Sequence, residues 1–158
     1  MTLIQDDIFK DILPPYTVEE ARTDIGTCVI ELPIYWTIFK KTKKNKTILV
    51  GMNWYRNAHF IQQNNCKKYF HKLIQGQLQR TSIGTLESVT VHYDLFPKLM
   101  NCDAMNVISC IDKFLMDALQ EYKIIENDNV KYYKGGSWNV GERSKNNPRI
   151  TATIKGGN

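Results

Sequence analysis

The sequence predicts an α+β domain with a mixed sheet and packed helices. Two segments place apolar residues at helical spacings of three and four, and several shorter segments are rich in β-branched and aromatic residues. Strands and helices follow one another without regular βαβ alternation, and no internal repeat is present. At 158 residues and 42% hydrophobic content, the chain can bury one core without metal or disulfide staples.

Residues 1–27 differ in charge from the rest of the chain. They hold six acidic and two basic residues, a net charge of −4, which leaves +9 on the remainder. Within this segment Thr17 and Glu20 are spaced as a capped helical turn. We expect residues 1–27 to be an acidic N-terminal extension that packs on a domain formed by residues 28–158. The basic charge of that domain favours a polyanionic partner.

Composition also bears on the cellular compartment and on whether disulfide or zinc sites are expected. The first residues lack both the basic start and the continuous apolar core of a secretory signal, and no apolar run could cross a bilayer, so we expect a cytoplasmic protein. The four cysteines (Cys28, Cys66, Cys102 and Cys110) form no CxxC pair, and the three histidines do not complete a zinc-site spacing. Reduced and mostly buried thiols are expected.

The first strands are predicted at residues 27–39, where β-branched and aromatic residues are interrupted by Pro33. Five lysines follow within eight residues, and an apolar pattern resumes at residues 48–57. This order predicts a hairpin with a basic tip, whose lysines either contact phosphates or form a solvated turn. The lysines are Lys40, Lys41, Lys43, Lys44 and Lys46.

A helix is predicted over residues 58–79, with a polar face that carries Lys67, Lys68, His71 and Lys72. Residues 88–97 alternate apolar and polar side chains as a half-exposed strand does, and Pro97 ends that strand. Residues 130–140 and 148–154 predict two more strands, joined by a polar loop that contains Arg143 and Lys145.

The second helix is predicted over residues 105–122. Its apolar stripe comprises Val107, Ile108, Ile111, Phe114, Leu115, Ala118, Leu119 and Tyr122, and its opposite side Asn106, Cys110, Lys113, Asp117 and Gln120. Asp112 lies about 140° around the helix axis from Asp117. One metal ion is therefore not expected to bind both carboxylates from the same subunit.

Carboxylates flank this helix, with Asp103 before it and Asp128 in a short polar turn after it. Because the ends of such a helix lie about 25 Å apart, Asp128 meets Asp103 only if the connection or the strand from Val130 folds back. Oxygen ligands converging there with Lys113 would suit magnesium and phosphodiester hydrolysis. The plainer alternative is solvated acids and an ordinary i,i+4 pair between Lys113 and Asp117.

One short motif points to a different nuclease class. Glu121, Tyr122 and Lys123 spell the ExK element of restriction-type nucleases, which normally lies on a strand. Here the motif falls at the end of the predicted helix, which argues against that class.

The helix and its flanks resemble the RusA family of Holliday junction resolvases, mostly phage and prophage enzymes. In that family a strand ending in proline leads into Asp-x-Asp-Asn, a lysine, Asp-Ala-Leu and a final acidic turn. Here "VHYDLFP" is followed by Asp103-Ala104-Met105-Asn106, Lys113 precedes Asp117-Ala118-Leu119, and Asp128 follows Asp117 by eleven residues. The resemblance covers residues 28–155. The sequence differs from the family pattern in two ways. Met105 stands in place of the second acid, and about one extra helical turn separates Asn106 from Lys113.

The resemblance implies a magnesium-dependent homodimer that makes symmetric nicks in a four-way DNA junction. It implies Asp103 and Asp128 as catalytic metal ligands, with Asp112 as the expected third ligand; whether Asp112 or Asp117 replaces the missing acid stays open, and without a replacement the site is one carboxylate short. Lys113 would stabilise the phosphate charge, and Asn106 and Asp117 would orient the ligands. The lysines of the hairpin tip, Arg143 and Lys145 would contact the DNA backbone.

Two rival functions remain on the same scaffold. One is a catalytically inactive relative that binds DNA or a protein partner, with Met105 marking the lost ligand. The other is a nuclease for a different branched DNA, such as a flap or a fork. The sequence does not separate these substrates, because selectivity for branched DNA depends on the shape of the dimer.

Overall fold

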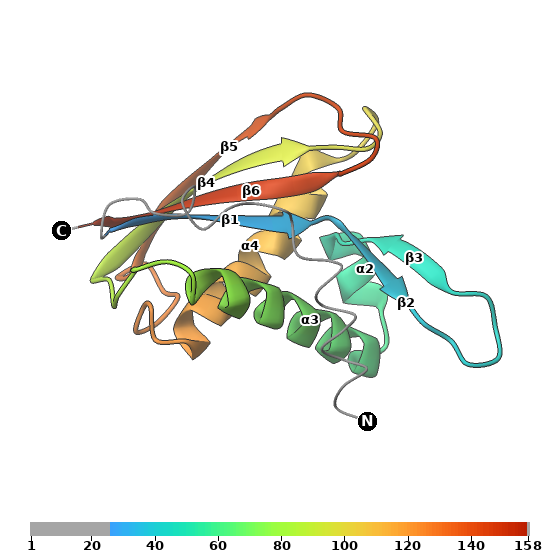
Figure 1. Cartoon of the computed structure of the whole chain (residues 1–158), viewed down its shortest axis with the longest axis horizontal. Helices are drawn as coiled ribbons and strands as arrows, with labels where there is room; N and C mark the ends of the chain where they lie inside the picture. The colour runs from blue at the N-terminus through green and yellow to red at the C-terminus, as the bar shows by residue number, and fades with distance from the viewer. Residues whose placement is uncertain (1–25, 158) are drawn as a thin grey trace.

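The computed structural model describes residues 26–157 as a four-stranded sheet with two long helices on one face and a small hairpin beside it (Figure 1). The strands are β1 (Thr27–Pro33), β2 (Tyr35–Ile38), β3 (Lys46–Leu49), β4 (Ser88–Phe96), β5 (Tyr133–Val140) and β6 (Arg149–Gly157). The helices are α2 (Met52–Asn57), α3 (Phe60–Leu78) and α4 (Ala104–Glu121). The coarse prediction of an α+β fold with a mixed sheet is confirmed.

The main sheet has the strand order β1-β6-β4-β5. β6 pairs antiparallel with both β1 and β4, whereas β5 pairs parallel with β4. A parallel neighbour requires a crossover connection, and α4 supplies it between β4 and β5. Thus α4 begins near the end of β4 and returns the chain to the level where β4 starts.

The core lies between the sheet and the two long helices. β1, β4 and β6 bury every second side chain, as strands with one covered face do. From α4 the core receives the whole apolar stripe up to Leu119, with Tyr122 packed at its margin. Phe114 of α4 stacks on Phe70 of α3 with ring centroids 5.2 Å apart, and Tyr55 of α2 meets it edge-on. These rings join the three helices.

Several local predictions are confirmed. The strand break at Pro33, the hairpin formed by β2 and β3, the two long helices and the two last strands are all present. Cys28, Cys66 and Cys110 are buried, Cys102 is half-buried, and all four thiols are free. The predicted turn at Thr17 and Glu20 lies outside the described residues. Within residues 26–157, no helix combines the length and apolar character of a membrane span.

Three local predictions are wrong. His71, placed on a polar helix face by the sequence pattern, is buried, because α3 and α4 pack on each other as well as on the sheet. Residues 52–57 form helix α2 instead of continuing the apolar strand pattern. The strand expected from Val130 begins only at Tyr133, after a turn.

Replacing Phe114 with alanine should remove the ring that joins the helices. We expect Phe114→Ala to lower the free energy of unfolding by about 3–5 kcal/mol, because the ring is fully buried and leaves a cavity. Phe39→Ala is the matched control: Phe39 is 69% exposed, and its removal should change stability by less than about 0.5 kcal/mol. Urea denaturation of both variants checks this. Equal losses would contradict the packing described here.

Candidate functional site

Asp103 caps the N-terminus of α4. Its backbone is extended, and its carboxylate Oδ1 accepts a hydrogen bond of 3.2 Å from the backbone N–H of Asn106. Aspartate suits this position because a helix leaves its first N–H groups unsatisfied. The residue is exposed, so the carboxylate also faces solvent.

Asn106 connects this end of α4 to α2. Its side-chain Oδ1 accepts a hydrogen bond of 2.8 Å from the backbone N–H of Asn53. The side chain lies directly over Gly51, where an added Cβ would stand 2.3 Å from its Nδ2. Glycine at position 51 therefore makes room for Asn106, and the two helix starts are held against each other.

Asp112 lies halfway along α4 and faces the sheet. Its Oδ1 accepts hydrogen bonds from the hydroxyl groups of Tyr93 on β4, at 2.5 Å, and Tyr133 on β5, at 2.6 Å. Burial raises the pKa of Tyr93 well above its usual range, and the negative charge of Asp112 raises it further. Burial and the bond to Asp112 also raise the pKa of Tyr133. The half-buried carboxylate is thus satisfied by two phenols that stay protonated.

Asp128 lies beyond the opposite end of α4. Asn127 stabilises this turn, because its side-chain oxygen accepts hydrogen bonds from the backbone N–H groups of Asp128 and Asn129. Asp128 is exposed. The 18 residues of α4 span about 27 Å and lie between Asp103 and Asp128. Since β5 begins after Asp128 and runs away from it, the structure does not bring these two carboxylates together within one chain.

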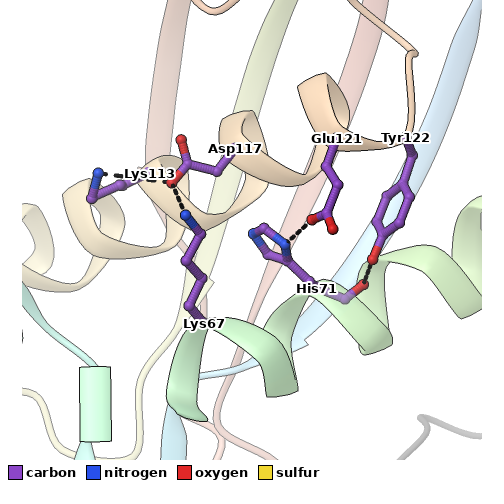
Figure 2. Close-up of polar contacts among 6 residues, drawn as sticks. All are labelled: Lys67, His71, Lys113, Asp117, Glu121 and Tyr122. Carbon is purple, nitrogen blue, oxygen red and sulfur yellow. Dashed lines mark hydrogen bonds and ion pairs between the residues drawn. The ribbon is translucent and has the colours of Figure 1, made fainter. Parts of the chain in front are cut away.

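Lys113 and Asp117 lie on the side of α4 that faces α3, as Figure 2 shows. The Nζ of Lys113 is 3.7 Å from the Oδ2 of Asp117, and the Nζ of Lys67 on α3 is 3.3 Å from the same oxygen. The expected i,i+4 pair is therefore present. Asp117 is ion-paired with both lysines, and within residues 26–157 neither Asp117 nor Lys113 is hydrogen-bonded or ion-paired to Asp103, Asp112 or Asp128.

No three His, Cys, Asp or Glu side chains within residues 26–157 are grouped so that they could hold a metal ion. The carboxylates predicted as ligands are instead spread along α4, at its start, middle and end. One chain by itself therefore does not fit the predicted magnesium site.

The predicted DNA-binding residues lie on two loops. All five lysines of the hairpin tip are exposed in the loop and first residue of β3 that follow β2, and Figure 1 shows this hairpin projecting from one end of the molecule. Arg143 and Lys145 are exposed in the loop between β5 and β6. Arg143 donates a hydrogen bond from Nε to the backbone oxygen of Lys98, 2.8 Å away, which fixes this loop beside the end of β4.

The sheet also forms a polar cluster that the sequence pattern did not single out. His92 Nδ1 lies 2.6 Å from the Oγ of Ser137, and His92 Nε2 lies 3.3 Å from an oxygen of Asp94. Both neighbours follow from strand geometry, since Asp94 is two residues along β4 and Ser137 is the cross-strand partner of His92. The alternation of residues 88–97 placed His92 and Asp94 on one face, but only the pairing with β5 adds Ser137.

Removing the hydroxyl of Tyr93 or Tyr133 should leave the half-buried carboxylate of Asp112 with one hydrogen bond fewer and so destabilise the fold. We expect Tyr93→Phe or Tyr133→Phe to lower the free energy of unfolding by about 1.5–3 kcal/mol at neutral pH, because each hydroxyl donates to a charged group. Tyr132→Phe is the control, since the hydroxyl of Tyr132 makes no bond to Asp112, and it should change stability by less than about 0.5 kcal/mol. Urea denaturation measures all three.

The same hydroxyls should make stability depend on pH in alkaline solution. Their pKa values are raised in the folded state above the ordinary value of 10.0, so above pH 10 the unfolded chain releases protons that the folded chain keeps. The free energy of unfolding should then fall by up to about 1.4 kcal/mol per pH unit for each tyrosine. A fall that is equally steep in Tyr93→Phe would contradict this explanation.

Comparison with known proteins assigns the chain to no family. No family model matches the chain, and no curated protein matches it.

Proposed function

We propose that the protein is a magnesium-dependent endonuclease that cleaves branched DNA, most readily four-way junctions, as a homodimer. The observation that carries the proposal is the position of two exposed carboxylates, Asp103 and Asp128, at the two ends of the rigid helix α4. A two-fold axis reverses the direction of one subunit relative to the other. The end of α4 that carries Asp128 in one subunit can then lie beside the end that carries Asp103 in the other.

The edge strand β5 suggests how two subunits would meet. Within the described residues, β5 forms one edge of the main sheet, next to β4, and it is exposed along most of its length. Its Trp138 and Val140 are 43% and 47% exposed, and Met105 at the start of α4 is 49% exposed. An edge strand with exposed apolar side chains favours pairing with another strand. Antiparallel pairing of β5 with its copy would set the start of one β5 beside the end of the other.

Such a dimer would place one magnesium site at each end of the shared interface. Asp103 of one subunit and Asp128 of the other would hold the ion, whereas Asp112, halfway along α4 and bonded to Tyr93 and Tyr133, would lie too far from either helix end to join them. Magnesium bound there would neutralise the scissile phosphate and activate water for its hydrolysis. Asn106 holds Asp103 in place through its backbone N–H. The lysines of the hairpin tip would bind the DNA backbone.

A second function is favoured by a different observation. Met105 stands where the resemblance calls for an acid, Asp112 is already bound by two tyrosines, and residues 26–157 group no three metal-ligating side chains. These features suit a relative that binds branched DNA without cutting it. Junction binding that is indifferent to magnesium, with no nicking, would identify this alternative.

Mixed dimers test whether the site is shared between subunits. Asp103→Asn and Asp128→Asn homodimers should each lose at least about 100-fold in nicking rate with magnesium, because each lacks a ligand in both sites. A purified heterodimer of the two variants should regain about half of the wild-type nicking, because one of its two sites has both carboxylates. It should make single nicks and no paired cuts. A labelled four-way junction on a denaturing gel measures this.

Glu126→Gln, next to Asp128 in the exposed turn, is the matched control and should cleave as wild type. A heterodimer as inactive as its parents would show that the carboxylates act within one subunit. Full activity of the Asp103→Asn homodimer, or activity in excess chelator, would refute the nuclease proposal itself.

The hairpin tip should set the salt dependence of DNA binding. Replacing its five lysines with serine should reduce the slope of log affinity against log salt concentration by up to about 4.5, because each phosphate contact contributes about 0.9. Lys123→Ser, at the far end of α4, is the single-site control and should leave the slope unchanged. Fluorescence anisotropy with a labelled junction at four salt concentrations measures both. An unchanged slope in the five-lysine variant would exclude the tip from the interface.

A further inference from the structure

A polar groove runs between α3 and α4, away from the end of α4 that carries Asp103. It has a volume of about 540 Å³ and is lined by Asn64, Lys67, Lys68, His71, Asp117, Gln120 and Glu121. Figure 2 shows four of them, Lys67 and His71 on α3 and Asp117 and Glu121 on α4, on facing turns of the two helices. Neither the proposed metal site nor the hairpin tip uses this groove.

His71 is the buried member of the groove. Its side chain is 10% exposed, and its Nδ1 is bonded to the carboxylate of Glu121 on α4. The hydroxyl of Tyr122 donates to the backbone oxygen of His71 at 3.1 Å, which fixes this turn of α3. The other ring nitrogen, Nε2, is buried and has no hydrogen-bond partner among the described residues. A buried nitrogen without a partner is unfavourable, so such an atom indicates a missing ligand or water.

The unpaired nitrogen lies on the side of the His71 ring that is nearer to Lys67 (Figure 2). In Figure 2, Nε2 is turned away from Glu121, toward the side on which Lys67 and Asp117 lie. Lys67 and Lys113 share the single carboxylate of Asp117, and Lys68 forms no ion pair with any described residue. The lining thus holds two ammonium groups and two carboxylates, Lys113 adds a third ammonium group beside Asp117 from outside the lining, and the amides of Asn64 and Gln120 can add donors.

This chemistry suits an anion better than a metal ion. Asp117 is already neutralised by two lysines, and Glu121 is bonded to His71. Within residues 26–157, no three His, Cys, Asp or Glu side chains are placed to hold a metal. A phosphate group, in contrast, accepts hydrogen bonds from several N–H donors at once and is attracted by surplus positive charge.

We propose that the groove between α3 and α4 binds a phosphate group, with the Nε2–H of His71 as the buried donor and Lys67 and Lys68 as charged donors. The ring then carries both protons, one directed to Glu121 and one to the phosphate. The phosphate is either a free anion or a phosphodiester of the DNA backbone, since both offer the same oxygen acceptors. The site does not depend on the nuclease proposal and can exist without it.

NMR of the imidazole nitrogens in the full-length protein tests the proposal directly. Inorganic phosphate, titrated at constant ionic strength against sodium chloride, should produce a saturable change at His71 Nε2 toward the shift of a doubly protonated ring. A blunt DNA duplex, titrated in a second arm, separates the two sources. Saturation by phosphate alone assigns a free anion, and saturation by duplex assigns a backbone phosphate.

Two substitutions of His71 form a matched pair. Glutamine places its amide donor near the position of Nε2, whereas asparagine reaches only the position of Nδ1. His71→Gln should therefore keep phosphate binding within about threefold, and His71→Asn should weaken it at least about tenfold. Lys68→Gln should weaken binding as well, and Lys123→Gln, outside the groove, should not. Thermal unfolding of each variant confirms that it is folded.

Three results would overturn the proposal. One is a wild-type His71 signal that does not respond to phosphate or duplex, which would leave a buried water as the partner of Nε2. Another is an equal response to chloride, which would reflect screening of the lysines. The last is equal phosphate affinity in His71→Gln and His71→Asn.

Discussion

The packing of α4 on the sheet is the constraint on which the rest of the structure depends. Because β5 runs parallel to β4, the chain must cross from one end of the sheet to the other, and α4 makes that crossing with an almost fully buried apolar stripe. The stripe fixes the rotation of the helix about its axis. It thereby decides the surroundings of every charged residue on α4, since Asp112 must face the strands and Lys113 and Asp117 must face α3.

Charged residues on one helix therefore have separate roles. Asp112 is held by two buried phenols, Asp117 is neutralised by two lysines, and Glu121 is bonded to a buried histidine. The carboxylates of Asp103 and Asp128 stay exposed at the two helix ends. A segment this apolar tolerates its acids because each one is paired or solvated. Of these acids, only Asp103 and Asp128 are bonded to no other side chain within residues 26–157, which is why the proposed function uses these two and requires a second copy of the chain.

The fold was largely predictable, because its signals are local. Alternation over residues 88–97 and the helical spacing around Phe114 each depend on a few neighbouring residues, and both elements are present. The buried position of His71 was not predictable, because it arises where α3 packs on α4, and helical spacing alone assigns this residue to a polar face. The bonds from Tyr93 and Tyr133 to Asp112 depend on the pairing of β4 with β5, which no local pattern reports. The separation of Asp103 and Asp128 likewise depends on how the chain crosses the sheet between β4 and β5, which no local pattern reports. That these two carboxylates bind one metal ion together remains a prediction.

The central claim is that the carboxylates at the two ends of α4 serve one cation across a subunit interface. Anomalous diffraction from crystals grown with manganese, a substitute for magnesium, tests it most directly. We expect manganese between Asp103 of one subunit and Asp128 of its neighbour, at both ends of the interface. A dimer that keeps these carboxylates apart, with manganese bound at neither, would contradict the account.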